Sequence, residues 1–227
     1  MEVKFGWEHE KEAKFWNTVI SSSGIIGLII GSFTAGHILS LGRRRTIIVM
    51  SFVASLGVIP TLYLNLWYII AGRFIFGLAA GTIIVASSIY LNETVPPEKS
   101  STFDFTTNFG VILGMTTCLL LGLGLPDANK DLIAAKQTEF WRLINLAPLV
   151  LCLISLFNWI CFFKLESLKY CFIKADYEGA KDNIRKIYRT TNENTVERIF
   201  AIQLTNFTNA SENIKQSPGY CKVLCDK

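Results

Sequence analysis

Long stretches without charge dominate this sequence. Among acidic, basic and histidine side chains, residues 18–41, 46–92, 105–126 and 143–163 contain only His37 and Arg73. A helix needs about 20 consecutive apolar residues to cross the hydrocarbon core of a bilayer, and each stretch is at least that long. A helix also satisfies its backbone hydrogen bonds within its own segment, which lipid requires. The sequence therefore predicts an all-α protein that crosses a membrane several times.

The composition excludes other classes of protein. Charged residues make up 18% of the chain, against about 25% in soluble domains, which argues against a water-soluble enzyme. The net charge of +4 is too small and too clustered to indicate a nucleic-acid partner. Residues 1–15 mix glutamate with lysine and have no short apolar core, so they are not a signal peptide. The six cysteines form no Cys/His set that predicts a metal site.

We expect a polytopic bundle of five transmembrane helices within residues 17–163. These helices cover residues 17–39, 46–64, 68–91, 103–123 and 141–163. An external N-terminal segment, residues 1–16, precedes the bundle. A cytoplasmic segment of amphipathic helices follows at residues 164–204, where Ala180, Ile184 and Ile187 share one apolar stripe. Residues 205–227 are polar and weakly patterned, which predicts a flexible tail.

Glycine pairs indicate how the predicted helices pack. The pairs with G-x-x-x-G spacing are Gly27/Gly31, Gly77/Gly81 and Gly110/Gly114. This spacing lets the backbones of two membrane helices approach closely. Glycine is frequent in membrane spans in any case, but three pairs on three helices favour a packed bundle over isolated helices that face lipid.

Basic residues gather on one side of the predicted topology. Three arginines, residues 43–45, follow the first span, Lys99 follows the third, and Lys164 follows the fifth. Because positively charged loops concentrate on the cytoplasmic side of a membrane, we expect this side to be cytoplasmic and the N-terminal segment to be external.

Short motifs occur at the ends of these spans. They comprise Gly36, Gly42, Arg43 and Arg44 in the first loop, Gly72 and Arg73 early in the third span, Tyr90, Glu93 and Pro96 at its end, and Glu166, Ser167 and Lys169 after the fifth span. Taken singly, each motif has a simpler explanation. The arginines of the loop orient the chain, Arg73 reaches to the interface, and Glu93 lies in cytoplasmic water.

Together, in this order and spacing, the motifs resemble the sugar porter family of the major facilitator superfamily, which includes the facilitative glucose transporters. The family's first basic loop reads Gly-x-x-x-Asp/Asn-Arg-x-Gly-Arg-Arg. Gly36, Gly42, Arg43 and Arg44 match it, Ser40 stands near the acidic or amide position, and the loop is one residue shorter. The sequence departs from the family where both prolines beside Glu166 and Ser167 are missing and where Ser100 replaces an arginine. The resemblance implies that the five helices correspond to the second to sixth of a twelve-helix fold. It makes the chain a partial N-terminal half, without the first helix.

The resemblance also implies alternating access, in which two halves rock around a substrate bound near the middle of the membrane. The implied cytoplasmic gating network consists of Gly42, Arg43, Arg44, Glu93, Glu166 and Lys169, and the family motif also includes Gly72, Arg73, Tyr90 and Pro96. We expect the two glutamates to pair with Arg43 or Arg44 when the cytoplasmic side is closed. Exposed pairs contribute only about 0–1 kcal/mol each, so such a gate needs several of them.

The implied substrate site lies on the predicted span 103–123. Asn108 stands where the family places a polar amide, usually glutamine, and Val111 and Met115 lie further along the same face. An amide both donates hydrogen bonds to sugar hydroxyls and accepts them. Alternatively, Asn108 hydrogen-bonds a neighbouring helix. The sequence leaves both roles open.

The sequence thus predicts transmembrane transport of a hexose-like sugar by an integral, multi-pass protein of the plasma membrane or an organelle membrane. The alternatives are an organic ion carrier of the same superfamily and a non-transporting membrane subunit or sensor. The expected partners are a sugar, the lipid bilayer, and a second transporter half or a second copy of the chain. We expect no nucleic acid, cofactor or metal. The sequence contains no evident nucleophile–base pair, so no catalytic residue is assigned and no enzyme is expected.

Overall fold

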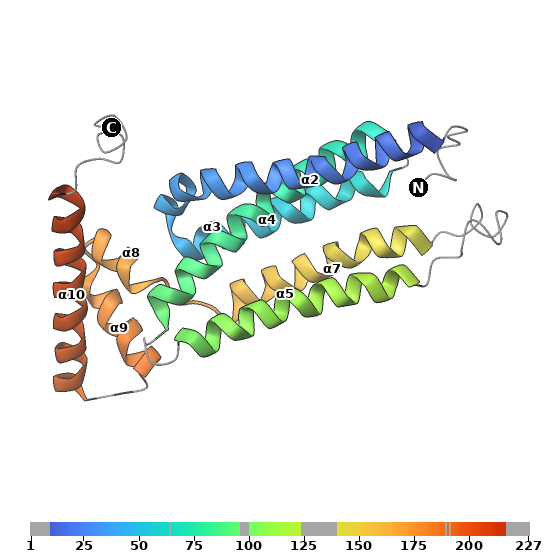
Figure 1. The fold of residues 1–227 in the computed structure, drawn as a ribbon. Helices are drawn as coiled ribbons and strands as arrows, with labels where there is room; N and C mark the ends of the chain where they lie inside the picture. Colours follow the sequence, from blue (N-terminus) through green and yellow to red (C-terminus); the bar gives the residue numbers. More distant parts are fainter. Residues whose placement is uncertain are drawn as a thin grey trace. The chain divides into compact units, whose positions relative to one another are not determined.

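The computed structural model describes residues 10–63, 65–95, 100–123, 140–188, 190 and 192–216. The chain divides into two compact units, Met1–Lys164 and Leu165–Lys227, which are treated separately below. All regular elements in the described ranges are helical, as the all-α prediction requires (Figure 1).

The first unit contains the long apolar helices. They are α2 (Glu10–Ile38), α3 (Arg43–Val58), α4 (Leu66–Thr94), α5 (Ser100–Leu123) and α7 (Phe140–Cys161), with single 3-10 turns η1 (Leu39–Leu41) and η2 (Ile59–Leu62) beside α3. Gly42 separates η1 from α3 with a φ of 118°, a conformation that favours glycine. Proline lacks the backbone N–H that a helix interior uses, and Pro60 lies in η2, where α3 has ended. The Asn65 side chain caps α4 by accepting a hydrogen bond from the Trp67 amide at 3.1 Å.

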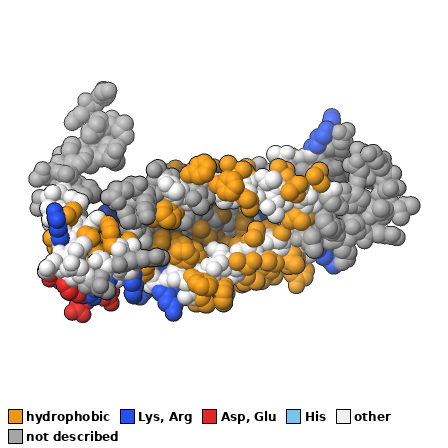
Figure 2. Space-filling view, turned by 90° about the horizontal axis from the view of Figure 1, so that it is seen from below, with side chains coloured by type: hydrophobic (Ala, Val, Ile, Leu, Met, Phe, Trp, Pro, Cys, Tyr) orange, Lys and Arg blue, Asp and Glu red, His pale blue; other side chains and the backbone are white. Residues whose placement is uncertain are grey.

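Within the residues that the structure describes, four helical segments have the length and apolar composition to cross a membrane. They are Lys14–Leu41, Arg43–Leu62, Leu66–Thr94 and Ile144–Cys161. The predicted span 103–123 falls on α5, whose apolar part, Thr107–Leu123, is shorter. Helix α2 begins at Glu10, so residues 10–16 of the predicted N-terminal segment are helical; residues 1–9 lie outside the described ranges. Hydrophobic side chains gather over the membrane helices in Figure 2, as contact with lipid requires.

Helices α2 and α4 pack with their backbones in close contact. A Cβ atom on Gly31 would lie 2.1 Å from the Leu78 carbonyl oxygen, and one on Gly77 would lie 2.1 Å from the Gly24 carbonyl oxygen. Only glycine permits this approach. The Thr82 hydroxyl donates a hydrogen bond to the Gly31 carbonyl at 3.1 Å, which adds a polar link between the two helices. Two of the three glycine pairs therefore pack these helices as predicted.

The third glycine pair behaves differently. A side chain placed on Gly110 or Gly114 of α5 would find no atom within 4 Å in the part of the chain that the structure describes. The prediction that this pair packs against a neighbouring helix is therefore wrong for the described residues. Spacing alone marks a surface that permits close approach, but it does not supply the second helix.

The second unit has a small apolar core of its own. Helices α8 (Leu168–Ile173), α9 (Tyr177–Tyr188) and α10 (Glu193–Gln216) enclose Leu168, Cys171, Phe172, Ala180, Ile184 and Val196. The predicted stripe contributes to it, because Ala180 and Ile184 are fully buried and Ile187 packs against the cluster.

Helix α10 continues further than the sequence analysis expected. The prediction of a flexible tail from residue 205 is wrong for residues 205–216, which are helical to Gln216. Phe200, Leu204 and Phe207 form a stripe at helical spacing, and the Phe207 ring lies 5.7 Å from that of Phe172. This apolar contact stabilises the helix through a sequence that is otherwise polar. Residues 217–227 lie outside the described ranges.

The α2–α4 contact generates a direct prediction. Gly77→Ala places a methyl group against a backbone carbonyl of α2, so it should lower the free energy of unfolding by about 1–3 kcal/mol. Unfolding of the detergent-solubilised protein by a denaturing detergent measures this change. Gly110→Ala is the matched control and should leave stability nearly unchanged, because its added methyl meets nothing within 4 Å. Equal losses in the two variants would contradict the packing described here.

Candidate functional site

A largely buried ion pair joins the start of α3 to the end of α4. Arg43 Nη2 donates a hydrogen bond to Glu93 Oε1 at 3.1 Å, and Arg43 Nε lies 3.0 Å from Glu93 Oε2. The two side chains are only 13% and 10% exposed. Arg43 is the first residue of α3, and Gly42 turns the chain so that the arginine faces the last turn of α4.

Arg44, the next residue, contacts backbone carbonyls near the end of α7. Its Nη2 donates a hydrogen bond to the Trp159 carbonyl at 3.3 Å, and its Nε donates one to the Phe163 carbonyl. Both carbonyls lie at the C-terminal end of α7. Neighbouring arginines in the first turn of α3 therefore link this helix to α4 and α7.

The predicted gating residues fall into two groups. Gly42, Arg43, Arg44 and Glu93 meet in the first unit as described, which includes the predicted pairing of Arg43 with Glu93. Glu166 and Lys169 belong to the second unit. There the Asn183 amide donates a hydrogen bond to the Glu166 backbone carbonyl at 3.0 Å. Pairing of the Glu166 carboxylate with an arginine stays a prediction.

The family-motif residues have clear structural positions. Gly72 lets α4 approach α3, because a Cβ there would lie 2.7 Å from the Gly57 carbonyl oxygen. Tyr90 is buried, and its ring lies 5.1 Å from that of Trp159 on α7. Arg73 lines a cavity between the helices. Pro96 lies outside the described residues.

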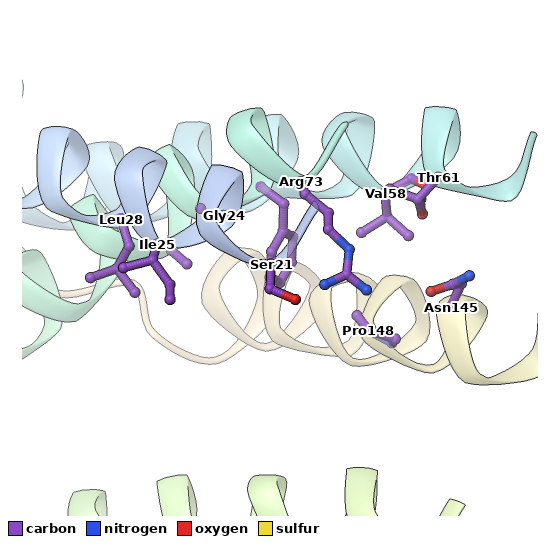
Figure 3. A pocket seen from close by; sticks show the side chains of 12 residues that line it. Ser21, Gly24, Ile25, Leu28, Val58, Thr61, Arg73, Asn145 and Pro148 are labelled. Carbon is purple, nitrogen blue, oxygen red and sulfur yellow. Dashed lines mark hydrogen bonds between the residues drawn. The ribbon is translucent and has the colours of Figure 1, made fainter. Parts of the chain in front are cut away.

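A cavity of about 360 Å³ opens between α2, α3, η2, α4 and α7. Its lining residues are Ser21, Gly24, Ile25, Leu28, Val58, Thr61, Arg73, Phe76, Gly77, Ala80, Asn145 and Pro148. Figure 3 shows the Arg73 side chain extending from α4 between Ser21 of α2 and the Pro148 and Asn145 region of α7. Among these described residues the wall is mostly apolar, and its polar side chains are those of Ser21, Thr61, Arg73 and Asn145.

Sequence reasoning did not assign this cavity. The available signal was Arg73, because a charged residue inside a membrane span usually faces the interior of the helix bundle or a cavity. Asn145 gave no comparable signal, since it is a single amide near the start of an apolar span. Ser21 was indistinguishable from a serine that packs one helix against another.

The predicted substrate residues lie elsewhere. Asn108, Val111 and Met115 are all on α5 and are exposed in the described structure, Val111 by 51% and Met115 by 65%. None of the three lines the cavity beside Arg73. The structure therefore does not bring the two sets together, and the role of the α5 residues stays a prediction.

The helical fold and the long apolar segments of the described residues define a polytopic helical membrane protein. A family model described as "Sugar (and other) transporter" matches residues 2–220, and the chain belongs to this family. It is an integral membrane protein. The family is one of transporters rather than of enzymes.

Named relatives agree with this assignment. Hexose transporter 1 of Plasmodium falciparum is 26% identical over 202 residues, covering 84% of this chain and 40% of the relative. Glucose transporter GlcP of Staphylococcus epidermidis is 29% identical over 175 residues, covering 75% of this chain and 36% of the relative. The chain thus spans less than half the length of these relatives.

A solved structure shares the fold. The major facilitator superfamily proton:xylose symporter XylE, bound to 6-bromo-6-deoxy-D-glucose, aligns with a TM-score of 0.70 at 19% identity, covering 90% of this chain and 46% of the symporter. The predicted major facilitator fold is therefore confirmed for this part of the chain.

The buried pair predicts a large and specific loss of stability. Arg43→Ala or Glu93→Ala leaves one charge buried without its partner, so each should lower the free energy of unfolding by about 3–5 kcal/mol. The double variant should cost clearly less than the two single losses combined. Arg45→Ala, at the exposed neighbouring position, is the control and should have little effect. Additive single losses would show that the two residues do not interact.

Proposed function

We propose that this chain is part of a membrane transporter that moves a hexose-like sugar by alternating access. Membership of the sugar transporter family carries the proposal. The names of the matched hexose and glucose transporters and the shared fold support it. Alternating access needs two halves that close around the substrate. This chain spans less than half the length of the matched transporters.

We assign the sugar contact to α5. Asn108 presents an amide that donates to sugar hydroxyls and accepts from them, which suits a neutral polyol. Val111 and Met115 provide apolar surface on the same helix, against which the carbon skeleton of a sugar packs. All three side chains are exposed, so a substrate can reach them.

The gate in this proposal lies at the arginine-rich end, which we place in the cytoplasm. The Arg43–Glu93 pair holds the ends of α3 and α4 together. Glu166 and Lys169 join this network when the cytoplasmic side is closed. No residue is assigned a catalytic role.

The partners in this proposal are a sugar, the lipid bilayer and a second half of the transport unit. That half is either a further segment of a longer protein or a second copy of this chain. Coverage of 40% of the hexose transporter and 46% of the xylose symporter supports the need for it.

One observation favours a second candidate, an organic ion carrier of the same superfamily. Arg73 extends into the cavity, and the lining residues that the structure describes include no acidic side chain. A guanidinium in such a wall suits the carboxylate of an organic anion, with which it forms two parallel hydrogen bonds.

Uptake into membrane vesicles from cells that express the chain tests the main proposal. D-glucose should enter faster than L-glucose, and other hexoses should compete with it more strongly than organic anions or cations do. Asn108→Ala should reduce D-glucose uptake about tenfold, since it removes hydrogen bonds to the substrate worth about 1–1.5 kcal/mol. Asn108→Gln keeps the amide and should retain most of the activity.

Two results would contradict the proposal. Equal uptake of the two glucose enantiomers, at the level of vesicles without the chain, would favour a non-transporting subunit. Saturable uptake of organic anions that depends on Arg73 and is insensitive to hexoses would favour the ion carrier.

A further inference from the structure

Backbone carbonyls at the C-terminal end of α7 need hydrogen-bond donors from outside the helix. The last carbonyls of an α-helix have no amide partner within the helix. At this end the amides of Phe162 and Phe163 both donate to the Asn158 carbonyl, at 2.9 and 3.2 Å, and the Lys164 amide donates to the Phe162 carbonyl at 3.1 Å. These bonds satisfy Asn158 and Phe162 but leave the Trp159 and Phe163 carbonyls to other donors.

Arg44 supplies donors to both of these carbonyls. Its Nη2 lies 3.3 Å from the Trp159 carbonyl oxygen, and its Nε binds the Phe163 carbonyl oxygen. The two carbonyls lie on either side of the point where α7 ends at Cys161. A planar guanidinium carries donors in a fixed fork and can bind two acceptors at once, and its positive charge suits the negative end of the helix dipole.

An apolar contact reinforces this link. The Trp159 ring lies 5.1 Å from the Tyr90 ring of α4 and 5.0 Å from the Phe163 ring. Tyr90 belongs to the buried cluster of Ala35, Leu39, Ile47, Ala86 and Tyr90, against which Trp159 packs. The last turn of α7 thus contacts α4 through the Trp159 indole and α3 through Arg44.

We propose that Arg44 is a positioning residue that caps the C-terminal end of α7 and clamps it to the start of α3. It acts through two backbone carbonyls, which require the fork of an arginine and not merely a positive charge. Arg43, by comparison, pairs with the Glu93 carboxylate on α4. The role of Arg44 differs from a role in orienting the chain across the membrane, for which any cation serves.

The neighbouring Arg45 offers a matched control. It has the same charge, lies one residue further along α3, and its side chain is exposed. Substituting either arginine changes the positive charge of the loop by the same amount. Within the described ranges, Arg44 and not Arg45 donates hydrogen bonds to the end of α7.

Hydrogen–deuterium exchange of the full chain in lipid nanodiscs tests the proposal, with peptides that cover residues 158–166. In Arg44→Ala the last turn of α7 should open more often, and its amides should exchange about 10–100-fold faster, as expected for loss of hydrogen bonds to a charged donor. Arg44→Lys keeps the charge but loses the fork, so exchange should still be about tenfold faster. Arg45→Ala should match the unmodified protein.

Three outcomes would overturn the clamp. Unchanged exchange at residues 162–164 in Arg44→Ala would show that the arginine does not hold this turn. Full protection in Arg44→Lys would show that charge alone suffices. Faster exchange in Arg45→Ala equal to that in Arg44→Ala would assign the effect to the loop's total charge. If Arg44→Ala does not fold, the comparison of Arg44→Lys with Arg45→Ala still decides. None of these readouts depends on transport, so the clamp and the proposed function are tested separately.

Discussion

The close backbone contact between α2 and α4 is the interaction on which the rest of the first unit depends. Apolar side chains gain little by leaving lipid for one another, so membrane helices associate through close packing and hydrogen bonds. Four glycines, at positions 27, 31, 77 and 81, let the two backbones meet, and the Thr82 hydroxyl adds a bond across the contact. Helix α4 then carries Arg73 to the cavity, Tyr90 to the buried cluster and Glu93 to the ion pair. The gate proposed at the Arg43–Glu93 pair therefore depends on the packing of α4 against α2.

Polar interactions concentrate at the arginine-rich end of the unit. Gly42 allows the turn that directs Arg43 to α4 and Arg44 to α7. Arg43 thus links the start of α3 to the end of α4 through a carboxylate, and Arg44 links it to the end of α7 through backbone carbonyls. In the proposed transport cycle this end carries the gate, and the Arg43–Glu93 pair joins α3 to α4 there.

The sequence carried enough information to predict four of the five expected membrane helices, the family, two glycine contacts and the Arg43–Glu93 pair. Each of these depends on a local pattern: an uncharged run, a motif, or a fixed spacing. The helix at residues 205–216 was not predictable, because Phe207 is stabilised by contact with Phe172, which is distant in sequence. The partners of Arg44 were not predictable either, since backbone carbonyls have no signature in a sequence. The cavity arises from the relative placement of several helices, so only Arg73 gave a sign of it.

The most direct test of the account asks whether the first unit crosses a bilayer. Single cysteines at Ser40 and Tyr63, both exposed and at opposite ends of the segment formed by α3 and η2, are introduced into a chain without its native cysteines. A membrane-impermeant maleimide is then applied to sealed vesicles of known sidedness. The account predicts that Ser40→Cys reacts only from the cytoplasmic side and Tyr63→Cys only from the opposite side. Labelling of both positions from the same side would contradict it.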